Sequence, residues 1–219
     1  MYEKEKWTQK DWLLHMIMFI LSLIFIAFGV AFSIKANLGT SPISSLPYVV
    51  SQLTSLSVGN ATIIFHSFLI VLQMIILRRN FERFQLLQLP VAIFFGKMTD
   101  IALNTLDFVQ ADSYFSSWIL CIIGIFLVAI GVTLEVSSKI ITLAGEGLIL
   151  AICFVLPASK FGTMKIIVDV SMITLAAVLG LVMTHQLIGV REGTVAAAIL
   201  VGLISKQLFK LAKVLKPTH

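Results

Sequence analysis

The chain has 219 residues, of which 58% are hydrophobic and only 12% charged, and its formal net charge is +5. A soluble domain averages about 25% charged residues, so this chain lacks the polar surface that a water-soluble globule needs. The composition excludes ordinary soluble, disordered and disulfide-rich proteins, and it predicts a single membrane domain over residues 1–219. Cys121 and Cys153 lie in apolar stretches without a second pair, which indicates neither a disulfide framework nor a zinc site.

Six apolar stretches are long enough to cross a bilayer, which takes about 20 residues in a helix. In chain order they cover residues 12–34, 59–77, 84–106, 115–134, 166–188 and 194–213. Two further apolar segments are poor crossings. Segment 41–58 contains two prolines and many hydroxyl side chains, and segment 143–157 is short, with Gly145-Glu146-Gly147 near its start. They are either two additional crossings or re-entrant half-helices, which a membrane tolerates only where protein or a water-filled cavity satisfies their backbone.

The positive-inside rule favours the re-entrant interpretation. With six crossings, nearly all lysines and arginines fall on one side, and the other side receives the acidic loop 107–112 with only Lys35 and Arg191. Eight crossings would instead export Lys139 and the arginines of 78–83. The predicted fold is therefore an all-α polytopic membrane protein with six transmembrane helices plus two re-entrant half-helices, and with both termini cytoplasmic.

The chain also contains a weak internal repeat. Three pairs of short segments align, at offsets of 102, 103 and 106 residues: 29–32 with 131–134, 58–64 with 161–167, and 96–99 with 202–205. Each half, 12–106 and 115–213, then reads span, re-entrant segment, span, span. Because three crossings is an odd number, the two halves form an inverted 3+3 repeat, as in many transporters. Chance matches in an apolar chain of low complexity are the alternative.

Three short glycine-rich motifs run through the chain: ANLGTSP followed by LP at 36–47, TLAGEGL at 142–148 and GVREGT at 189–194. Together they resemble the YczE/YyaS/YitT group of bacterial integral membrane proteins, over nearly the whole chain. Ala144 stands where members often have a proline before the Gly-Glu-Gly element. The resemblance implies a multi-pass protein of the bacterial cytoplasmic membrane with a compact fold, and it brings no established biochemical activity.

Both re-entrant segments begin with residues suited to a helix N-terminus. Thr40, Ser41 and Ser44 supply hydroxyl groups around Pro42, and Gly145-Glu146-Gly147 supplies glycines and an acid in the first turn. Because helix N-termini carry partial positive charge, two tips that meet near the midplane predict a site for a small anion, a carboxylate or a polar group. Simple capping of buried helix ends is the alternative.

Charged side chains inside a span cost about 2.5–3.5 kcal/mol each at the bilayer centre, so they must face inward or lie near an interface. Lys97 and Asp100 are three residues apart on one predicted helix, which favours mutual neutralisation. Glu135 lies four residues before Lys139, a spacing typical of a solvated surface pair.

His66 and Asp169 occupy equivalent positions in the two halves, so inverted symmetry predicts that they approach each other and share a proton. A histidine bonded to a neighbouring carbonyl or hydroxyl group is the alternative. Together with Lys97 and Asp100, they are our candidates for a proton relay or gate.

The segment from Lys206 to Lys216 alternates lysines with leucines, which predicts contact with anionic lipid and no role in binding nucleic acid. The sequence contains no phosphate loop, nucleophile elbow, metal cluster or cofactor fingerprint, so we expect neither a cofactor nor enzyme activity. These observations predict a transporter or channel for a small solute, with proton coupling left open. A substrate-binding membrane subunit of a multi-component importer and, less favoured, a lipid-modifying membrane enzyme are the alternatives. A homodimer is also left open.

Overall fold

The computed structural model describes residues 8–215, with side chains described for residues 8–211. Within this part of the chain every regular element is a helix. The α-helices are α1 Gln9–Lys35, α2 Pro42–Leu53, α3 Val58–Leu77, α4 Gln88–Thr105, α5 Tyr114–Ser138, α6 Ala144–Val155, α7 Phe161–Thr184 and α8 Glu192–Leu215. Two short 3-10 turns, η1 Arg78–Asn80 and η2 Arg83–Leu87, join α3 to α4.

Six of these helices are long and apolar enough to cross a membrane: α1, α3, α4, α5, α7 and α8. This confirms the six predicted spans, and the chain is a multi-pass membrane protein. The two remaining helices, α2 and α6, have 12 residues each. At about 1.5 Å per residue, each is about 18 Å long, whereas the hydrocarbon layer is about 30 Å thick. Neither short helix can cross the layer alone.

Helix α7 differs most from its predicted bounds, because it begins at Phe161 rather than at residue 166 and ends at Thr184 rather than at residue 188. The chain leaves the helix where His185 adopts the left-handed conformation, with a φ of 57°. The apolar run continues past this turn, which is why composition alone extended the span too far. The early start places Lys165 within the helix instead of in a cytoplasmic loop.

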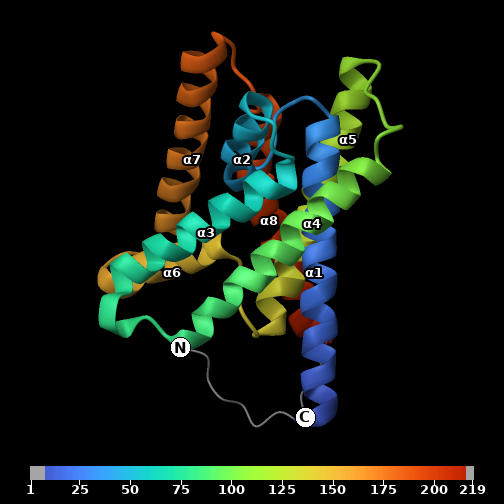
Figure 1. Cartoon of the computed structure of the whole chain (residues 1–219). Helices are drawn as coiled ribbons and strands as arrows, with labels where there is room; N and C mark the ends of the chain where they lie inside the picture. The colour runs from blue at the N-terminus through green and yellow to red at the C-terminus, as the bar shows by residue number, and fades with distance from the viewer. Residues whose placement is uncertain (1–7, 216–219) are drawn as a thin grey trace.

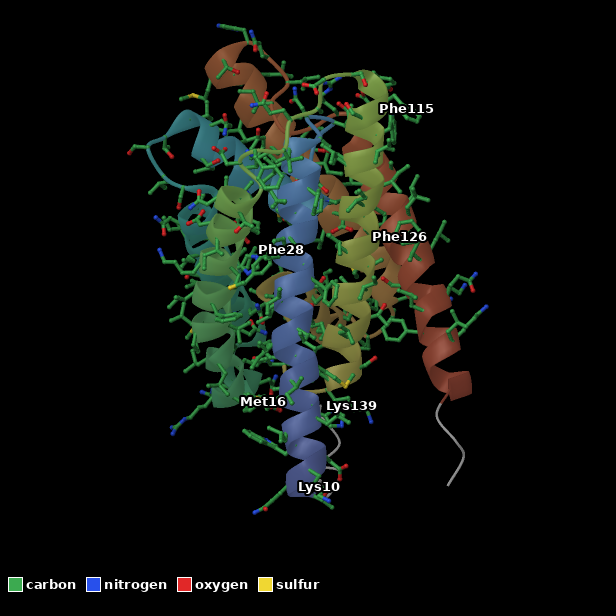
Figure 2. The ribbon with its side chains drawn as sticks, turned by 90° about the vertical axis from the view of Figure 1, so that its right-hand side faces the viewer. Lys10, Met16, Phe28, Phe115, Phe126 and Lys139 are labelled. Atoms are coloured by element: carbon green, nitrogen blue, oxygen red, sulfur yellow. The ribbon has the colours of Figure 1, made fainter. Side chains whose placement is uncertain are left out.

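The most extensive helix–helix contact among the described residues joins α1 and α5, which overlap in Figure 1 and lie side by side in Figure 2. Helix α4 packs on the other flank of α1, and α8 packs on α5. The short helices bridge the two halves, since α2 packs against α7 and α6 packs against α3. Helix α7 stands at the edge of the molecule beside α2 (Figure 1).

Glycines allow α1 and α5 to approach closely, as in many membrane helix pairs. A Cβ atom added at Gly29 would lie 2.6 Å from Cγ2 of Val128 and 2.8 Å from the carbonyl oxygen of Gly124. On the opposite side of the crossing, a Cβ atom added at Gly131 would lie 2.5 Å from Cγ1 of Ile26 and 2.8 Å from the carbonyl oxygen of Ser22. The two contacts therefore mirror each other. 

At each end of the bundle, polar contacts join segments that are distant in the sequence. At one end, where Figure 2 shows Lys10 and Lys139, the Nδ1 atom of His15 lies 2.8 Å from the carbonyl oxygen of Ser138. At the other end, where Figure 2 shows Phe115, Nζ of Lys35 lies 2.9 Å from Oδ1 of Asp107. The guanidinium group of Arg191 donates to the carbonyl oxygen of Asn37 at 2.8 Å. The residues that the six-span prediction assigned to the outer face thus gather together.

Candidate functional site

The first candidate tip is the N-terminal turn of α2. Ser41 is its N-cap residue and Pro42 is its first helical residue, as the sequence predicted. The hydroxyl group of Ser41 donates to Oγ of Ser44 at 2.9 Å and makes no capping bond to the backbone, so the predicted side-chain cap is not formed. Thr40, Ser41 and Ser44 are all buried, and the hydroxyl group of Thr40 has no hydrogen-bond partner. Tip α2 is therefore polar, uncharged and partly unsatisfied.

The second candidate tip is the N-terminal turn of α6, which contains Gly145-Glu146-Gly147. Its first backbone donor is satisfied from another helix, because the N–H of Leu143 donates to Oε1 of Glu135 at 2.7 Å. Glu135 is only 2% exposed, so the prediction that it lies on the solvated surface is wrong. The left-handed residue Lys139 reverses the chain after α5, and this turn carries Leu143 back to the Glu135 carboxylate.

A charged cluster lies beside the α6 tip. Nζ of Lys165 lies 3.3 Å from Oδ2 of Asp169, one turn along α7, and 3.9 Å from Oε1 of Glu146. The side chain of Lys165 is 38% exposed, whereas those of Glu146 and Asp169 are 18% and 12% exposed. The ammonium group of Lys165 is therefore shared by two carboxylates, whereas the carboxylate of Glu135 accepts from the backbone at the α6 tip. Lys165 was not among the predicted site residues, although its spacing of four residues from Asp169 on one helix is typical of an ion pair.

The N-terminal tips of α2 and α6 meet through an apolar contact. A Cβ atom added at Gly145 would collide with the side chain of Ile43, in the first turn of α2. Behind the α6 tip, a Cβ atom added at Gly147 would lie 2.5 Å from Nε2 of Gln88 and 2.8 Å from Oε1 of Gln73. Both glycines of the Gly-Glu-Gly element are therefore required for close packing.

Two buried glutamines that the sequence analysis missed hold the α6 tip in place. The side-chain amide of Gln73 donates to Oε1 of Gln88 at 3.0 Å and to the carbonyl oxygen of Ala144 at 3.1 Å. Gln73 is 0% exposed, and its Oε1 atom has no hydrogen-bond partner. A buried amide is costly unless it is hydrogen-bonded, so a glutamine within an apolar span indicates a polar contact with another segment.

His66 and Asp169 are both buried, but the structure does not pair them. The imidazole ring of His66 stacks on Phe95 of α4, with ring centroids 5.7 Å apart, and its Nδ1 atom has no hydrogen-bond partner. The carboxylate of Asp169 instead faces Lys165. In the part of the chain with described side chains, no hydrogen bond or ion pair joins the two residues.

Lys97 and Asp100 do not neutralise each other, contrary to the spacing argument. Nζ of Lys97 donates to Oδ1 of Asn60 at 3.1 Å. The carboxylate of Asp100 accepts two bonds from the first turn of α3, one from the hydroxyl group of Ser57 and one from the N–H of Gly59, each at 2.7 Å. Asp100 therefore places a negative charge at the positive end of the α3 dipole. Both residues serve the α3–α4 contact, away from the charged cluster.

Other features of the described residues add little to this site. A cavity of ≈ 400 Å³ between α2, α3 and α7 is lined by apolar side chains such as Leu46, Phe65 and Leu179. Within residues 8–211, no group of three or more His, Cys, Asp or Glu residues is arranged to hold a metal ion. Of the predicted lipid-binding lysines, Lys206 and Lys210 are exposed. The side chain of Lys213 and all of Lys216 lie outside the described residues.

Comparison with known proteins gives a family and no activity. A family model described as a family of unknown function, DUF6198, matches residues 13–210. The match covers most of the chain, so the chain belongs to this family. The searches of curated proteins and of solved structures found no match. The likeness to the YczE/YyaS/YitT group stays a prediction.

Proposed function

We propose that this DUF6198 protein is a transporter that moves a small, positively charged solute through a site between the N-terminal tips of α2 and α6. The observation that carries the proposal is the cluster of Glu135, Glu146, Lys165 and Asp169, in which Glu135 and Asp169 are buried, beside a tip where two helices too short to cross the membrane meet. Ionisable groups inside a membrane are costly unless they face a bundle interior or an aqueous path. Broken helices that meet at such groups are a recurrent way to build a solute site.

We infer that α2 and α6 are re-entrant. The segment before α2 contacts the loop that leads into α8, because the N–H of Thr40 donates to the carbonyl oxygen of Gly189 at 3.2 Å. The segment after α2 contacts the last third of α4, through the bond from Ser57 to Asp100. Both contacts lie toward the end of the bundle that holds Lys35 and Asp107, which supports entry and exit on one side. Helix α6 starts near the opposite end, next to Gln88 at the start of α4.

We also infer that the two halves are an inverted repeat. The α1–α5 crossing supports this residue by residue: subtracting the offset of 102 from Gly131 gives Gly29. The α5 neighbours of Gly29 are Val128 and Gly124. Subtracting 102 from these two numbers gives Ile26 and Ser22, which are the α1 neighbours of Gly131. The short helices show the same exchange between the halves. Helix α2 of the first half packs on α7 of the second, and α6 of the second half packs on α3 of the first.

The charges at the site favour a different solute from the anion or carboxylate that helix N-termini alone suggest. The ammonium group of Lys165 faces two carboxylates, those of Glu146 and Asp169, so the cluster has surplus negative charge. A protonated amine or a small cation would neutralise the surplus, and the hydroxyl groups of the α2 tip would bind the polar remainder of the solute. This transport does not depend on a relay between His66 and Asp169.

A binding and uptake experiment tests the solute class. Purified full-length protein is unfolded thermally with a panel of amines, amino acids and inorganic cations, and with carboxylates as matched anions; a true ligand raises the apparent stability. We expect a cationic solute to stabilise the protein, and Glu146→Gln to abolish the shift. Glu192→Gln, an acid that pairs with Arg191 outside the cluster, is the matched control and should keep the shift.

Hits from the panel are then tested for uptake into proteoliposomes. Stabilisation by carboxylates alone, or equal loss of the shift in Glu192→Gln, would refute the proposed solute class. Binding without any uptake would refute transport.

We orient the protein in a bacterial cytoplasmic membrane with both termini cytoplasmic. The support is the base distribution, together with the position of Lys10 and Lys139 at one end of the bundle (Figure 2). Single cysteines at positions 79 and 112, in a chain without Cys121 and Cys153, test the orientation with a membrane-impermeant thiol reagent. Position 112 should react in intact cells and position 79 only after lysis. The reverse pattern would overturn the orientation.

A further inference from the structure

We propose that the two halves of the protein are in opposite conformations here, and that α7 closes onto α8 through Gly162 and Gly202 in an alternate state. The inference rests on the proposed function, because it supplies the movement that would open the site alternately to the two sides of the membrane. It follows from a comparison of the α3–α4 pair with the α7–α8 pair.

The α3–α4 pair is closed, meaning that the backbones of the two helices touch at their glycines. A Cβ atom added at Gly59 would collide with the carbonyl oxygen of Gly96 and lie 2.5 Å from the carboxylate of Asp100. A Cβ atom added at Gly96 would lie 2.5 Å from the carbonyl oxygen of Gly59. Both glycines are buried, so the two backbones are in direct contact.

The α7–α8 pair is open at the equivalent positions. The offsets of 103 and 106 residues equate Gly59 with Gly162 and Gly96 with Gly202. A Cβ atom added at Gly162 or Gly202 would meet nothing within 4 Å, and both glycines are exposed. The same residue type therefore makes a tight backbone contact in one half and faces open space in the other.

Some core-facing positions of the two pairs are nevertheless alike. His66 of α3 and Asp169 of α7 are equivalent, and they are 2% and 9% exposed. Thr99 of α4 and Ser205 of α8 are equivalent, and they are 1% and 6% exposed. The two pairs thus match at these positions, although α7 and α8 are less buried as a whole than α3 and α4.

Two lysines explain why the second pair is open. The offsets equate Ser57 with Lys160 and Asp100 with Lys206. In the first half, Ser57 donates to Asp100 at 2.7 Å and stabilises the closed pair. In the second half, closure would bring two ammonium groups together, and like charges repel. Both lysines are exposed in this structure.

Closure of α7 would also cover the charged cluster. Lys165 is equivalent to Thr62 of α3, which is 5% exposed in the closed pair. The side chain of Lys165 is 38% exposed in the open pair. The gap between α7 and α8 therefore controls access to the lysine that neutralises Glu146 and Asp169.

A cross-linking experiment on the full chain in membranes tests the proposal. The test pair is Thr163→Cys with Leu203→Cys, in a chain without Cys121 and Cys153. These positions are equivalent to Asn60 and Lys97, whose side chains are hydrogen-bonded at 3.1 Å in the closed pair. Asn60→Cys with Lys97→Cys is therefore the matched positive control, and the same short bifunctional thiol reagent is used for both pairs.

We expect the control pair to cross-link efficiently and the test pair to cross-link within one chain at a lower yield. Adding Lys206→Asp should raise the yield of the test pair about two- to fivefold, the shift that one exposed charge pair produces. Lys210→Asp, one turn further along α8, should not raise it. Gly202→Val should fold normally and lose the cross-link, because a side chain there would block the backbone contact.

Three outcomes would overturn the proposal. The first is no cross-link in the test pair, with or without Lys206→Asp, while the control pair reacts. The second is a test-pair cross-link only between differently tagged copies, which would make the glycine face a contact between two chains. The third is an equal yield in Gly202→Val. Uptake is measured separately, so cross-linking without uptake would refute transport and leave the closure itself established.

Discussion

The contact between Asp100 and the first turn of α3 should contribute about 3 kcal/mol to stability, the sum of two hydrogen bonds to a charged group at about 1.5 kcal/mol each. We take the lower end of the usual range because Ser57 is exposed and Asp100 is half-buried. Both bonds are short, at 2.7 Å. The alternative partner, Lys97, would contribute only about 0.2–0.5 kcal/mol as a helical neighbour three residues away. Asp100→Ala should therefore destabilise the protein strongly.

Double-mutant cycles separate the two interpretations of Asp100. One cycle combines Ser57→Ala with Asp100→Ala, and the other combines Lys97→Met with Asp100→Ala. Stability is measured by reversible unfolding in mixed detergent micelles, followed by circular dichroism. We expect a coupling energy of about 1 kcal/mol or more for the first cycle and less than about 0.5 kcal/mol for the second. A larger coupling for Lys97 than for Ser57 would refute the assignment of Asp100 to the α3 cap.

Two further predictions use the same unfolding assay. Lys165→Met should lower the free energy of unfolding by about 1–2 kcal/mol, less than the loss of a fully buried ion-pair partner because Lys165 is partly exposed. Glu146→Gln should change it by less than about 0.5 kcal/mol, because it removes one of the surplus acids; equal losses in both variants would contradict the charge balance of the cluster. Gly131→Val should cost about 1–3 kcal/mol at the tight α1–α5 crossing, whereas Gly202→Val should cost less than about 0.5 kcal/mol. Equal costs would show that α8 is more closely packed at Gly202 than the structure indicates.

The spans could be predicted because a bilayer sets a minimum length for any helix that crosses it. Segments 41–58 and 143–157 failed that requirement through their prolines, hydroxyl groups and glycines, and they form the two 12-residue helices. Helix ends were less certain, because an apolar composition continues through a turn as readily as through a helix. The left-handed turn at His185 inside the predicted span 166–188 is the clearest case.

The partners of charged residues could not be predicted from spacing, because spacing describes only one helix. Lys97 and Asp100 are neighbours on α4, but the first turn of α3 offers each of them a better partner from another helix. Glu135 is close in sequence to Lys139, but the reversal of the chain after α5 presents a free backbone N–H to its carboxylate. In both cases a helix N-terminus with unsatisfied donors attracted the acid, and only the tertiary structure brings that terminus close.

Glycine at positions 162 and 202 is difficult to explain from the present conformation alone. In a helix interior, glycine is less stable than alanine by about 0.5–1 kcal/mol, a cost that a close backbone contact justifies at Gly96 of α4. No atom lies within 4 Å of an added Cβ at Gly162 or Gly202, so at Gly202, in the interior of α8, the same cost brings no contact. The two glycines would be required if α7 and α8 approached as α3 and α4 do. The proposed inverted repeat, which links the two pairs, therefore predicts a second arrangement of α7, whereas the α1–α5 crossing already has its glycines in contact on both sides.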